Sequence, residues 1–185
     1  MAQARQFEKT ALIIGILSAM EEERPRLMKM LEEAFGPVKA ATPVMDFPFT
    51  DYYDSEMGGH PVRYILLFER LIDPSTLSAV KTRTNEMEKL FTGKGTGRPI
   101  NIDPGTLSLA NLILATCKDR AHRIPLSDGI YGEVTLIYQN GDFQALPWTY
   151  ADYSSDEVRM HLRVFRSQYR LMLRDLVLDN KDKNN

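Results

Sequence analysis

Residues 119–148 have the sequence DRAHRIPLSDGIYGEVTLIYQNGDFQALPW, which indicates the fold of this part of the chain. This stretch contains Asp128-Gly129 and Asn140-Gly141, two dipeptides that favour type I′ turns because Gly readily adopts a positive φ and Asn or Asp tolerates one. The turns separate three segments of strand length in which apolar residues partly alternate, namely 120–126, 130–138 and 143–148. We therefore predict a three-stranded antiparallel meander.

If both turns have two residues, they fix how the strands pair. Tyr138 then faces Phe143, and Leu136 faces Ala145. These four residues share one mostly apolar face of the meander with Arg123, Val134 and Pro147. The opposite face carries Arg120, His122, Ile124, Tyr131, Glu133, Thr135, Leu146 and Trp148. On the opposite face Glu133 would lie across from Ile124 and Trp148, with His122 on a diagonal. A shift of one residue in register would separate these groups.

The polar face of this meander is the main candidate site. It combines cations, a carboxylate and aromatic rings, which together can bind a small anionic ligand such as a nucleotide or phosphorylated metabolite. The residues that we expect to contact the ligand there are Arg120, His122, Arg123, Tyr131 and Trp148. A solvated outer face of the sheet is the competing interpretation.

The same face would also suit an enzyme. His122 could then act as a general acid or base oriented by Glu133, while Arg120 would stabilise developing negative charge. Whether the protein is an enzyme is left open by the sequence.

Residues 46–59 form a loop-like segment that is rich in aromatic and acidic residues. Long loops in compact domains often cover a ligand, so Asp51 and Tyr52 are further candidate ligand contacts. Alternatively, the aromatic side chains of this segment anchor the loop to the core.

The first hundred residues alternate between strand and helix patterns. We predict strands at 11–17, 38–45, 62–68 and 98–103, and helices from about Glu22 to Gly36 and from Asp73 to about Phe91. Arg63 is the single charged residue of the apolar run 62–68, and Asn101 and Asp103 alternate with Ile100 and Ile102. For residues 107–117 we expect a helical turn followed by a strand.

This order, strand-helix-strand-strand-helix-strand, predicts an α+β fold with a ferredoxin-like split βαβ core. The meander would extend the sheet of that core. We expect a single domain over residues 10–178, with flexible tails at 1–9 and 179–185.

A long amphipathic helix is predicted after Ser154 and Ser155, with a core-facing apolar stripe at helical spacing. A second ridge of the same helix consists of Arg159, Arg163, Arg166, Arg170 and Arg174. This ridge gives a third hypothesis, an RNA-binding or protein-interaction module, although arginines on such helices are commonly solvated or paired. The remaining apolar residues Met160, Leu171 and Leu178 predict a homo-oligomer contact.

Composition excludes several classes of protein. The 185 residues carry a formal net charge of −2, so a generally basic nucleic-acid binder is not expected, although a local basic patch is compatible with this charge. The single Cys117, which we expect to be buried, excludes an internal disulfide and a multi-cysteine metal cluster. The three histidines are not spaced as helical metal ligands, so we predict no metal site and leave any cofactor unknown. Residues 11–17 are too short to span a bilayer, and we expect a cytoplasmic protein.

Six short strings carry a resemblance that covers nearly everything between the tails. They are FTDYY at 49–53, FER at 68–70, DPG at 103–105, KDRAHR at 118–123, DGIY at 128–131 and LPWTY at 146–150. Together they resemble a family of small bacterial and archaeal proteins of unknown function. The resemblance implies no established activity and no catalytic residues, but some members are named GTP-binding proteins in sequenced genomes.

The residues do not support a conventional GTPase. A P-loop needs Gly-x-x-x-x-Gly-Lys-Ser/Thr after a strand, whereas the nearest string, GKGTG at 93–97, follows a predicted helix. Asn180-Lys181-Asp182 lies in the tail and lacks the spacing of a guanine-reading motif.

Overall fold

The computed structural model describes residues 3–49, 57, 59–92 and 97–182, with the side chains of the last four of these left out. Nine strands of the described part form a single antiparallel sheet in the order β2-β4-β1-β5-β6-β8-β7, with β3 also paired to β4 and β9 to β8. The strands are β1 (Thr10–Ser18), β2 (Val38–Ala41), β3 (Met45–Asp46), β4 (Val62–Ile72), β5 (Ile100–Leu107), β6 (Asn111–Thr116), β7 (Ile124–Pro125), β8 (Tyr131–Gln139) and β9 (Asp142–Ala145). The predicted α+β class is confirmed.

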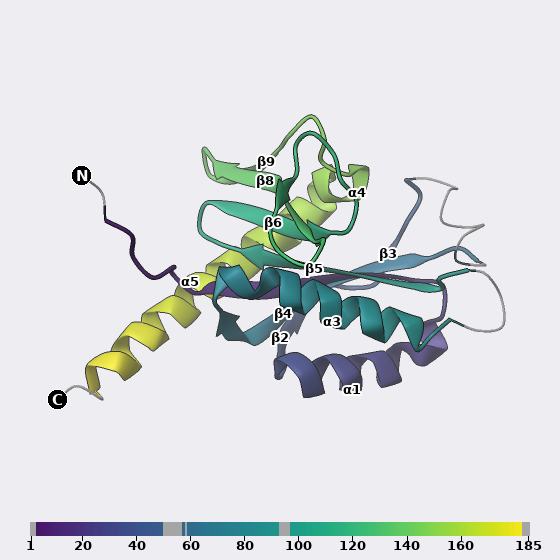
Figure 1. The fold of residues 1–185 in the computed structure, drawn as a ribbon, viewed down its shortest axis with the longest axis horizontal. Coiled ribbons are helices and arrows are strands. Elements are labelled where there is room, and N and C mark those ends of the chain that lie inside the picture. The colour runs from purple at the N-terminus through teal and green to yellow at the C-terminus, as the bar shows by residue number, and fades with distance from the viewer. Residues whose placement is uncertain (1–2, 50–56, 58, 93–96, 183–185) are drawn as a thin grey trace.

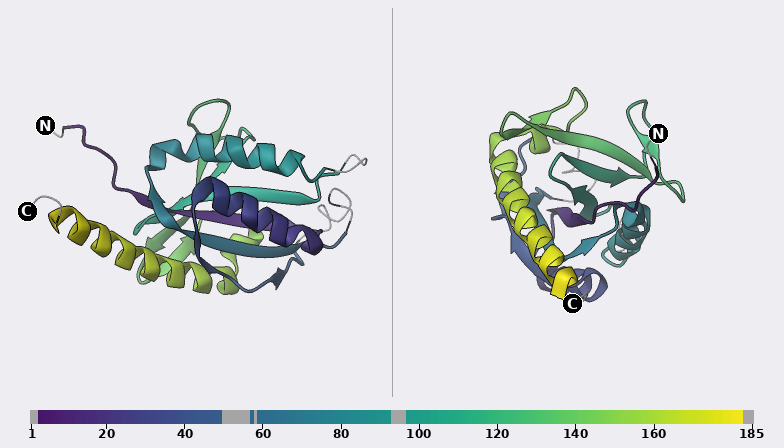
Figure 2. Two further views of the ribbon diagram at one scale, coloured as in Figure 1. Left: turned by 90° about the horizontal axis from the view of Figure 1, so that it is seen from below. Right: turned by 90° about the vertical axis from the view of Figure 1, so that its left-hand side faces the viewer.

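Helices cover both faces of this sheet (Figures 1 and 2). The described helices are α1 (Arg24–Phe35), α3 (Leu77–Lys89), α4 (Ala151–Ser154) and α5 (Asp156–Asp182). Helices α1 and α3 pack on one face through Leu31 and Met87, which join a cluster with Ile14 of β1. Helix α5 packs on the other face, where Leu162 joins a cluster with Ile13. The side chains of β1 therefore alternate between two cores, as the pleat of a central strand requires.

The helix boundaries follow from local sequence. A short 3₁₀ turn at Glu21–Glu23 precedes α1, Pro25 lies in the first turn of the helix, and Gly36 ends it with a φ of 93°. Pro suits a first turn because the N–H that it lacks has no partner there, and Gly adopts positive φ without strain. Before α3, the Asp73 side chain accepts a hydrogen bond of 2.9 Å from the backbone N–H of Ser75. Both predicted helices are thereby confirmed.

Two sequence expectations outside the meander are wrong. Residues 107–117 contain no helical turn, because β5 runs to Leu107 and the hydroxyl of Ser108 closes a tight turn into β6 by accepting from the N–H of Ala110 and Asn111. Cys117, at the end of β6, is exposed instead of buried. Helix α5 ends at Asp182, and the expected domain bounds and flexible tails remain predictions.

The meander exists, but only one of its two turns pairs as predicted. Tyr138 faces Phe143 and Leu136 faces Ala145, with positive φ at Asn140 and Gly141. Around the other turn Ile124 pairs with Gly132 instead of Glu133. The reason is that the backbone N–H of Leu126 bonds to the oxygen of Ile130, which shifts the register by one residue.

The predicted separation of the meander into an apolar and a polar face is consequently wrong. A β-bulge interrupts the pairing of β6 with β8, which places Glu133 beside Leu114 and Leu136 beside Leu112 on the α5 side of the sheet. Glu133 is 1% exposed and Thr135 is fully buried, so neither lies on an outer face.

No helix of the described part is long and apolar enough to cross a bilayer.

Candidate functional site

A cavity of about 270 Å³ lies where β5 and β6 diverge. These two strands pair only between Gly105–Leu107 and Leu112–Leu114, so the first half of β5 has no strand on that side. Strands β4, β5, β6 and β8, helices α3 and α4, and the segment after β3 all contribute to its lining. The charged lining residues are Arg63, Lys81, Arg98, Asp103, Lys118, Arg123, Glu133 and Asp152.

Side chains of α3 bond to the edge of β5 that β6 leaves unpaired. The ammonium of Lys81 donates to the backbone oxygen of Ile102 at 2.8 Å, and a carboxylate oxygen of Glu88 accepts from the N–H of Ile102 at 2.7 Å. The next residue of β5 that points to this edge is Pro104, which has no N–H that would need a partner. Helix α3 thus satisfies the backbone groups of β5 that β6 leaves unpaired, which allows β5 and β6 to separate at the cavity.

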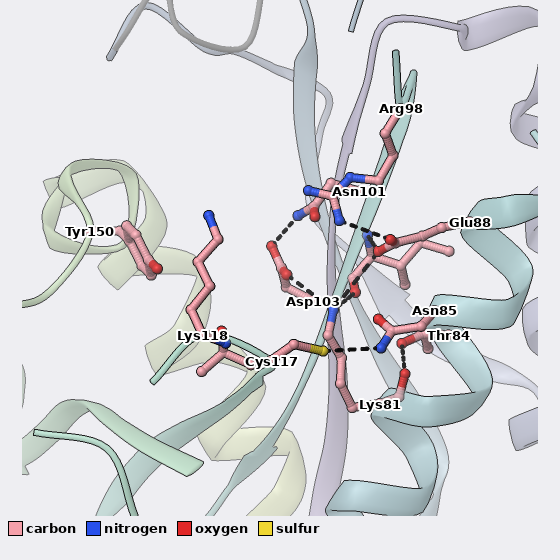
Figure 3. A network of polar contacts seen from close by, with 12 residues as sticks. Lys81, Thr84, Asn85, Glu88, Arg98, Asn101, Asp103, Cys117, Lys118 and Tyr150 are labelled. Carbon is pink, nitrogen blue, oxygen red and sulfur yellow. Dashed lines mark hydrogen bonds and ion pairs between the residues drawn. The ribbon is translucent and has the colours of Figure 1, made fainter. Parts of the chain in front are cut away.

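A chain of alternating charges crosses the floor of the cavity from α4 to α3. Figure 3 shows its members Asp103, Lys81, Glu88 and Arg98. In order, with the closest nitrogen–oxygen distances, it runs Asp152–Arg63 (2.6 Å), Arg63–Asp103 (4.0 Å), Asp103–Lys81 (3.6 Å), Lys81–Glu88 (3.8 Å) and Glu88–Arg98 (2.9 Å). Three cations balance three carboxylates, which is how buried charges are tolerated. Asp103, in the middle, has the most exposed of the three carboxylates, at 27%.

Gly15 of β1 makes room for Tyr153 of α4 at this floor. A Cβ at position 15 would overlap the hydroxyl oxygen of Tyr153 and lie 3.0 Å from a guanidinium nitrogen of Arg63. The Tyr153 hydroxyl is buried, and it has no hydrogen-bond partner among the described residues. Burial raises the pKa of this hydroxyl well above its usual range, so it keeps its proton at neutral pH.

Arg123 and Glu133 form a buried pair in the cavity wall. The guanidinium Nε of Arg123 donates to Glu133 Oε2 at 2.7 Å, and its other nitrogens donate to the backbone oxygen of Lys118 and the hydroxyl of Tyr150. Burial tends to lower the pKa of Arg123, but the hydrogen bonds and charges of Glu133 and Tyr150 outweigh it and raise the pKa. Glu133 Oε1 is buried without a partner among the described residues.

His122 supports this pair from outside. Its Nε2 lies 3.0 Å from Glu133 Oε2, and its ring stacks on Trp148 with centroids 5.0 Å apart. The indole N–H of Trp148 donates to the backbone oxygen of Val134, which fixes the stack against β8. Neither His122 nor Trp148 is among the residues that line the cavity.

Cys117 and Lys118 lie at the exposed side of the cavity. The sulfur of Cys117 accepts a hydrogen bond of 3.2 Å from the side-chain amide of Asn85. Figure 3 shows the Lys118 side chain between Tyr150 on one side and Asn101 and Asp103 on the other. Within the described part of the chain the Lys118 ammonium forms no ion pair, so its charge is open to the cavity.

The structure brings together His122, Arg123, Glu133 and Trp148, but only Arg123 and Glu133 line the cavity. Arg120 is exposed in the preceding turn and donates to the oxygen of its neighbour Asp119. Tyr131 is half-buried where β8 pairs with Pro125. Asp51 and Tyr52 lie outside the described residues, although the nearby Phe47 and Phe49 are lining residues.

The sequence reasoning missed the cavity floor, which is formed by Arg63, Lys81, Asp103 and Asp152. Two signals were present: a charge inside the apolar run 62–68, and polar residues at alternate positions of the strand at 98–103. Among the described residues no group of three or more His, Cys, Asp or Glu side chains is arranged to hold a metal ion.

Residues 8–169 match the model of a family described as a domain of unknown function (DUF4416). The chain belongs to this family. The match spans all the described strands, α1, α3 and α4, and about half of α5, so the described lining of the cavity lies entirely within the family's domain. No curated protein and no solved structure matches the chain.

Proposed function

We propose that this protein binds a small anionic ligand, a nucleotide or phosphorylated metabolite, in the cavity between β5, β6 and α4. The observation that carries the proposal is the excess of positive charge in the lining. Among the described residues, five cationic side chains and three carboxylates line the cavity. Glu88, which pairs with Arg98, adds a fourth carboxylate, so the described cations exceed the described carboxylates by one. The ammonium of Lys118 supplies this excess, and an anion in a concave, partly buried site would be attracted to it.

The size of the cavity limits the ligand. Typical small-molecule pockets enclose roughly 300–1,000 Å³, and this cavity of about 270 Å³ is close to the lower end. A mononucleotide or a smaller phosphorylated compound fits that volume better than a dinucleotide does.

The ligand position that we propose differs from the one expected from the sequence, on the outer face of the meander. Arg123 donates one hydrogen bond to each of the Glu133 carboxylate, the backbone oxygen of Lys118 and the hydroxyl of Tyr150. It therefore fixes the cavity wall and orients Lys118. We assign the anion contact to Lys118, and a positioning role to Arg123.

We infer further that the first part of the chain forms a ferredoxin-like split βαβ core. This is supported by the antiparallel order β2-β4-β1-β5 and by the packing of α1 and α3 on the same face of the sheet. Strands β6–β9 then extend this core at β5, and the cavity lies at the junction.

The two alternative functions have less support in the geometry. Acid–base chemistry by His122 and Glu133 has the required hydrogen bond of 3.0 Å, but His122 is held against Trp148 outside the cavity lining. Three of the five arginines in the α5 ridge are engaged within the molecule. Arg159 and Arg163 pair with Asp142, and Arg166 stacks on Tyr138.

Thermal unfolding against a panel of ligands tests the proposal. The panel contains inorganic phosphate, nucleoside monophosphates, sugar phosphates and small dicarboxylates. A ligand at a hundred times its Kd adds about 2.7 kcal/mol, which raises the Tm of a chain of this size by roughly 5–10 °C. We expect Lys118→Gln to reduce the shift strongly. The control Lys39→Gln removes an exposed positive charge on β2, outside the cavity lining, and should leave the shift unchanged.

Alkylation of Cys117 gives a second, local readout, because it is the only cysteine of the chain and lines the cavity. A bound ligand is expected to slow its reaction with iodoacetamide, measured by mass spectrometry. The proposal fails if no anion of the panel raises the Tm or protects Cys117, or if Lys118→Gln and Lys39→Gln behave alike.

A further inference from the structure

We propose that the ligand of this cavity carries a protonated amine beside its anionic group, and that Asp103 receives the amine. The inference rests on the proposed function, and it specifies the chemical class of the ligand. Its basis is two carboxylates of the lining, Asp103 and Glu133, which an anion alone would leave without hydrogen-bond donors.

Asp103 has acceptor capacity that the described part of the chain does not use. Its carboxylate accepts a hydrogen bond from the side-chain amide of Asn101, and its ion-pair partners Lys81 and Arg63 lie at 3.6 and 4.0 Å, beyond hydrogen-bond distance. An ionised carboxylate offers about four lone-pair sites. The side chain is 27% exposed and lines the cavity, so the unused sites are available to a donor on a ligand.

Glu133 indicates the same kind of ligand group. Its Oε2 takes both the Arg123 and the His122 contacts, while Oε1 is buried without a partner among the described residues. A buried carboxylate oxygen without a donor is unfavourable, because it has lost its water without gaining a hydrogen bond. Two carboxylates that line one cavity, both short of donors, favour a ligand that brings hydrogen-bond donors.

The opposite side of the cavity is suited to the anionic group. Figure 3 shows the Lys118 side chain beside Tyr150, across the open space from Asn101 and Asp103. The Tyr150 hydroxyl accepts a hydrogen bond of 2.9 Å from Arg123, which leaves its own hydrogen free to donate. The cavity therefore presents donors at Lys118 and Tyr150, and an acceptor at Asp103.

This polarity discriminates against simpler ligands. An anion without an amine would place a negative charge or an unpaired group against Asp103, and an amine without an anion would meet the net positive charge of the lining. An amino acid with an acidic side chain, or a phosphorylated amine, satisfies both ends of the cavity.

Matched pairs of ligands test the inference. The probes are L-aspartate against succinate and phosphoethanolamine against ethyl phosphate, because each pair differs by the amine. Affinities are measured by calorimetry and by protection of Cys117 from iodoacetamide. We expect each amine to bind at least tenfold more tightly than its partner. Asp103→Asn should abolish this preference and keep anion binding, while Lys118→Gln should weaken both members of a pair by a similar factor.

The outcomes separate this inference from the proposed function. Equal affinities within each pair would overturn the amine and leave anion binding intact, whereas failure of all four probes, together with failure of the wider panel of anions, would overturn both. A preference that survives in Asp103→Asn would remove the role of Asp103. Since Asp103 belongs to the buried chain of charges, the folding of this variant is checked by thermal unfolding, and the comparison in the wild-type protein decides the ligand class independently.

Discussion

Replacement of Gly15 by Ala tests the packing at the floor of the cavity. The added Cβ would overlap the hydroxyl oxygen of Tyr153 and come within 3.0 Å of a guanidinium nitrogen of Arg63. Tyr153 is 1% exposed and lies in the core between α5 and the sheet, so it cannot move away freely. Overpacking of this kind costs about 1–3 kcal/mol, and the lower entropy of Ala in the unfolded chain offsets roughly 0.4–1 kcal/mol of it. We expect Gly15→Ala to lower the free energy of unfolding by about 2 kcal/mol.

Tyr153→Phe should rescue the variant, because it removes the atom that the new Cβ would overlap. The nearest remaining atom of the ring, Cζ, lies 3.6 Å from the Cβ position, which is an ordinary contact. Tyr153→Phe alone should cost little, since its hydroxyl has no partner among the described residues. In a double-mutant cycle measured by urea denaturation, the coupling energy between the two positions should be about 1.5 kcal/mol or more. In thermal unfolding Gly15→Ala should lower the Tm by roughly 4–8 °C.

Gly132→Ala serves as the control, because the atoms nearest to a Cβ there are methyl carbons of Leu126 at 3.4 and 3.5 Å. We expect it to cause no loss of stability, and the lower entropy of Ala in the unfolded chain should stabilise the variant by roughly 0.4–1 kcal/mol. If Gly15→Ala costs the same in the wild-type and Tyr153→Phe backgrounds within about 0.5 kcal/mol, Tyr153 does not occupy the space above Gly15 and the described floor is incorrect.

Three further predictions concern other parts of the structure. Glu133→Gln should destabilise the protein by about 3 kcal/mol in urea denaturation, because it leaves the buried charge of Arg123 without its partner; a loss below about 0.5 kcal/mol, the effect of an ordinary surface substitution, would show that the pair is not buried. The hydrogen bond from Arg163 lowers the pKa of Asp142 below its ordinary 3.8. The ionised Asp142 carboxylate therefore stabilises the folded protein above about pH 4, and this stabilisation is lost as the pH falls through the lowered pKa of the folded state. The stability difference between wild type and Asp142→Asn should accordingly be constant from about pH 5 to 7 and shrink below pH 4, and a difference that does not decrease as the pH falls would contradict this. The three apolar α5 residues Met160, Leu171 and Leu178 are about half exposed and still predict a homo-oligomer, which light scattering at micromolar concentration would contradict by giving a monomeric mass.

Local sequence predicted the elements well where a single residue type determines the backbone. Pro25 and Gly36 mark the ends of α1, Asp73 caps the turn before α3, and Asn140-Gly141 forms the turn between β8 and β9. Each of these depends on the φ of one residue or on a hydrogen bond to a close neighbour in sequence. Short, nearly continuous apolar runs likewise predicted β1 and β4, because a strand that is covered on both faces carries apolar side chains on each.

The same reasoning failed where one extra residue changed the pairing. The turn at Asp128-Gly129 adopts positive φ as predicted, yet the bond from Leu126 to Ile130 shifts the register. The bulge between β6 and β8 then turns Glu133 toward the core, next to Arg123. Neither shift leaves a clear pattern in the sequence, since both depend on which hydrogen bonds the neighbouring strand offers.

The sequence by itself determined the α+β class, the main helices, the strands on either side of them, and the presence of polar residues inside apolar strands, because these depend on local propensity and periodicity. Only the tertiary structure decided where the cavity lies. It arises because β6 leaves β5 after three paired residues and α3 bonds to the edge that is left. This brings Arg63, Asp103, Lys118 and Asp152, which are far apart in the chain, around one space. Such a site depends on contacts between distant segments, and no local pattern encodes them.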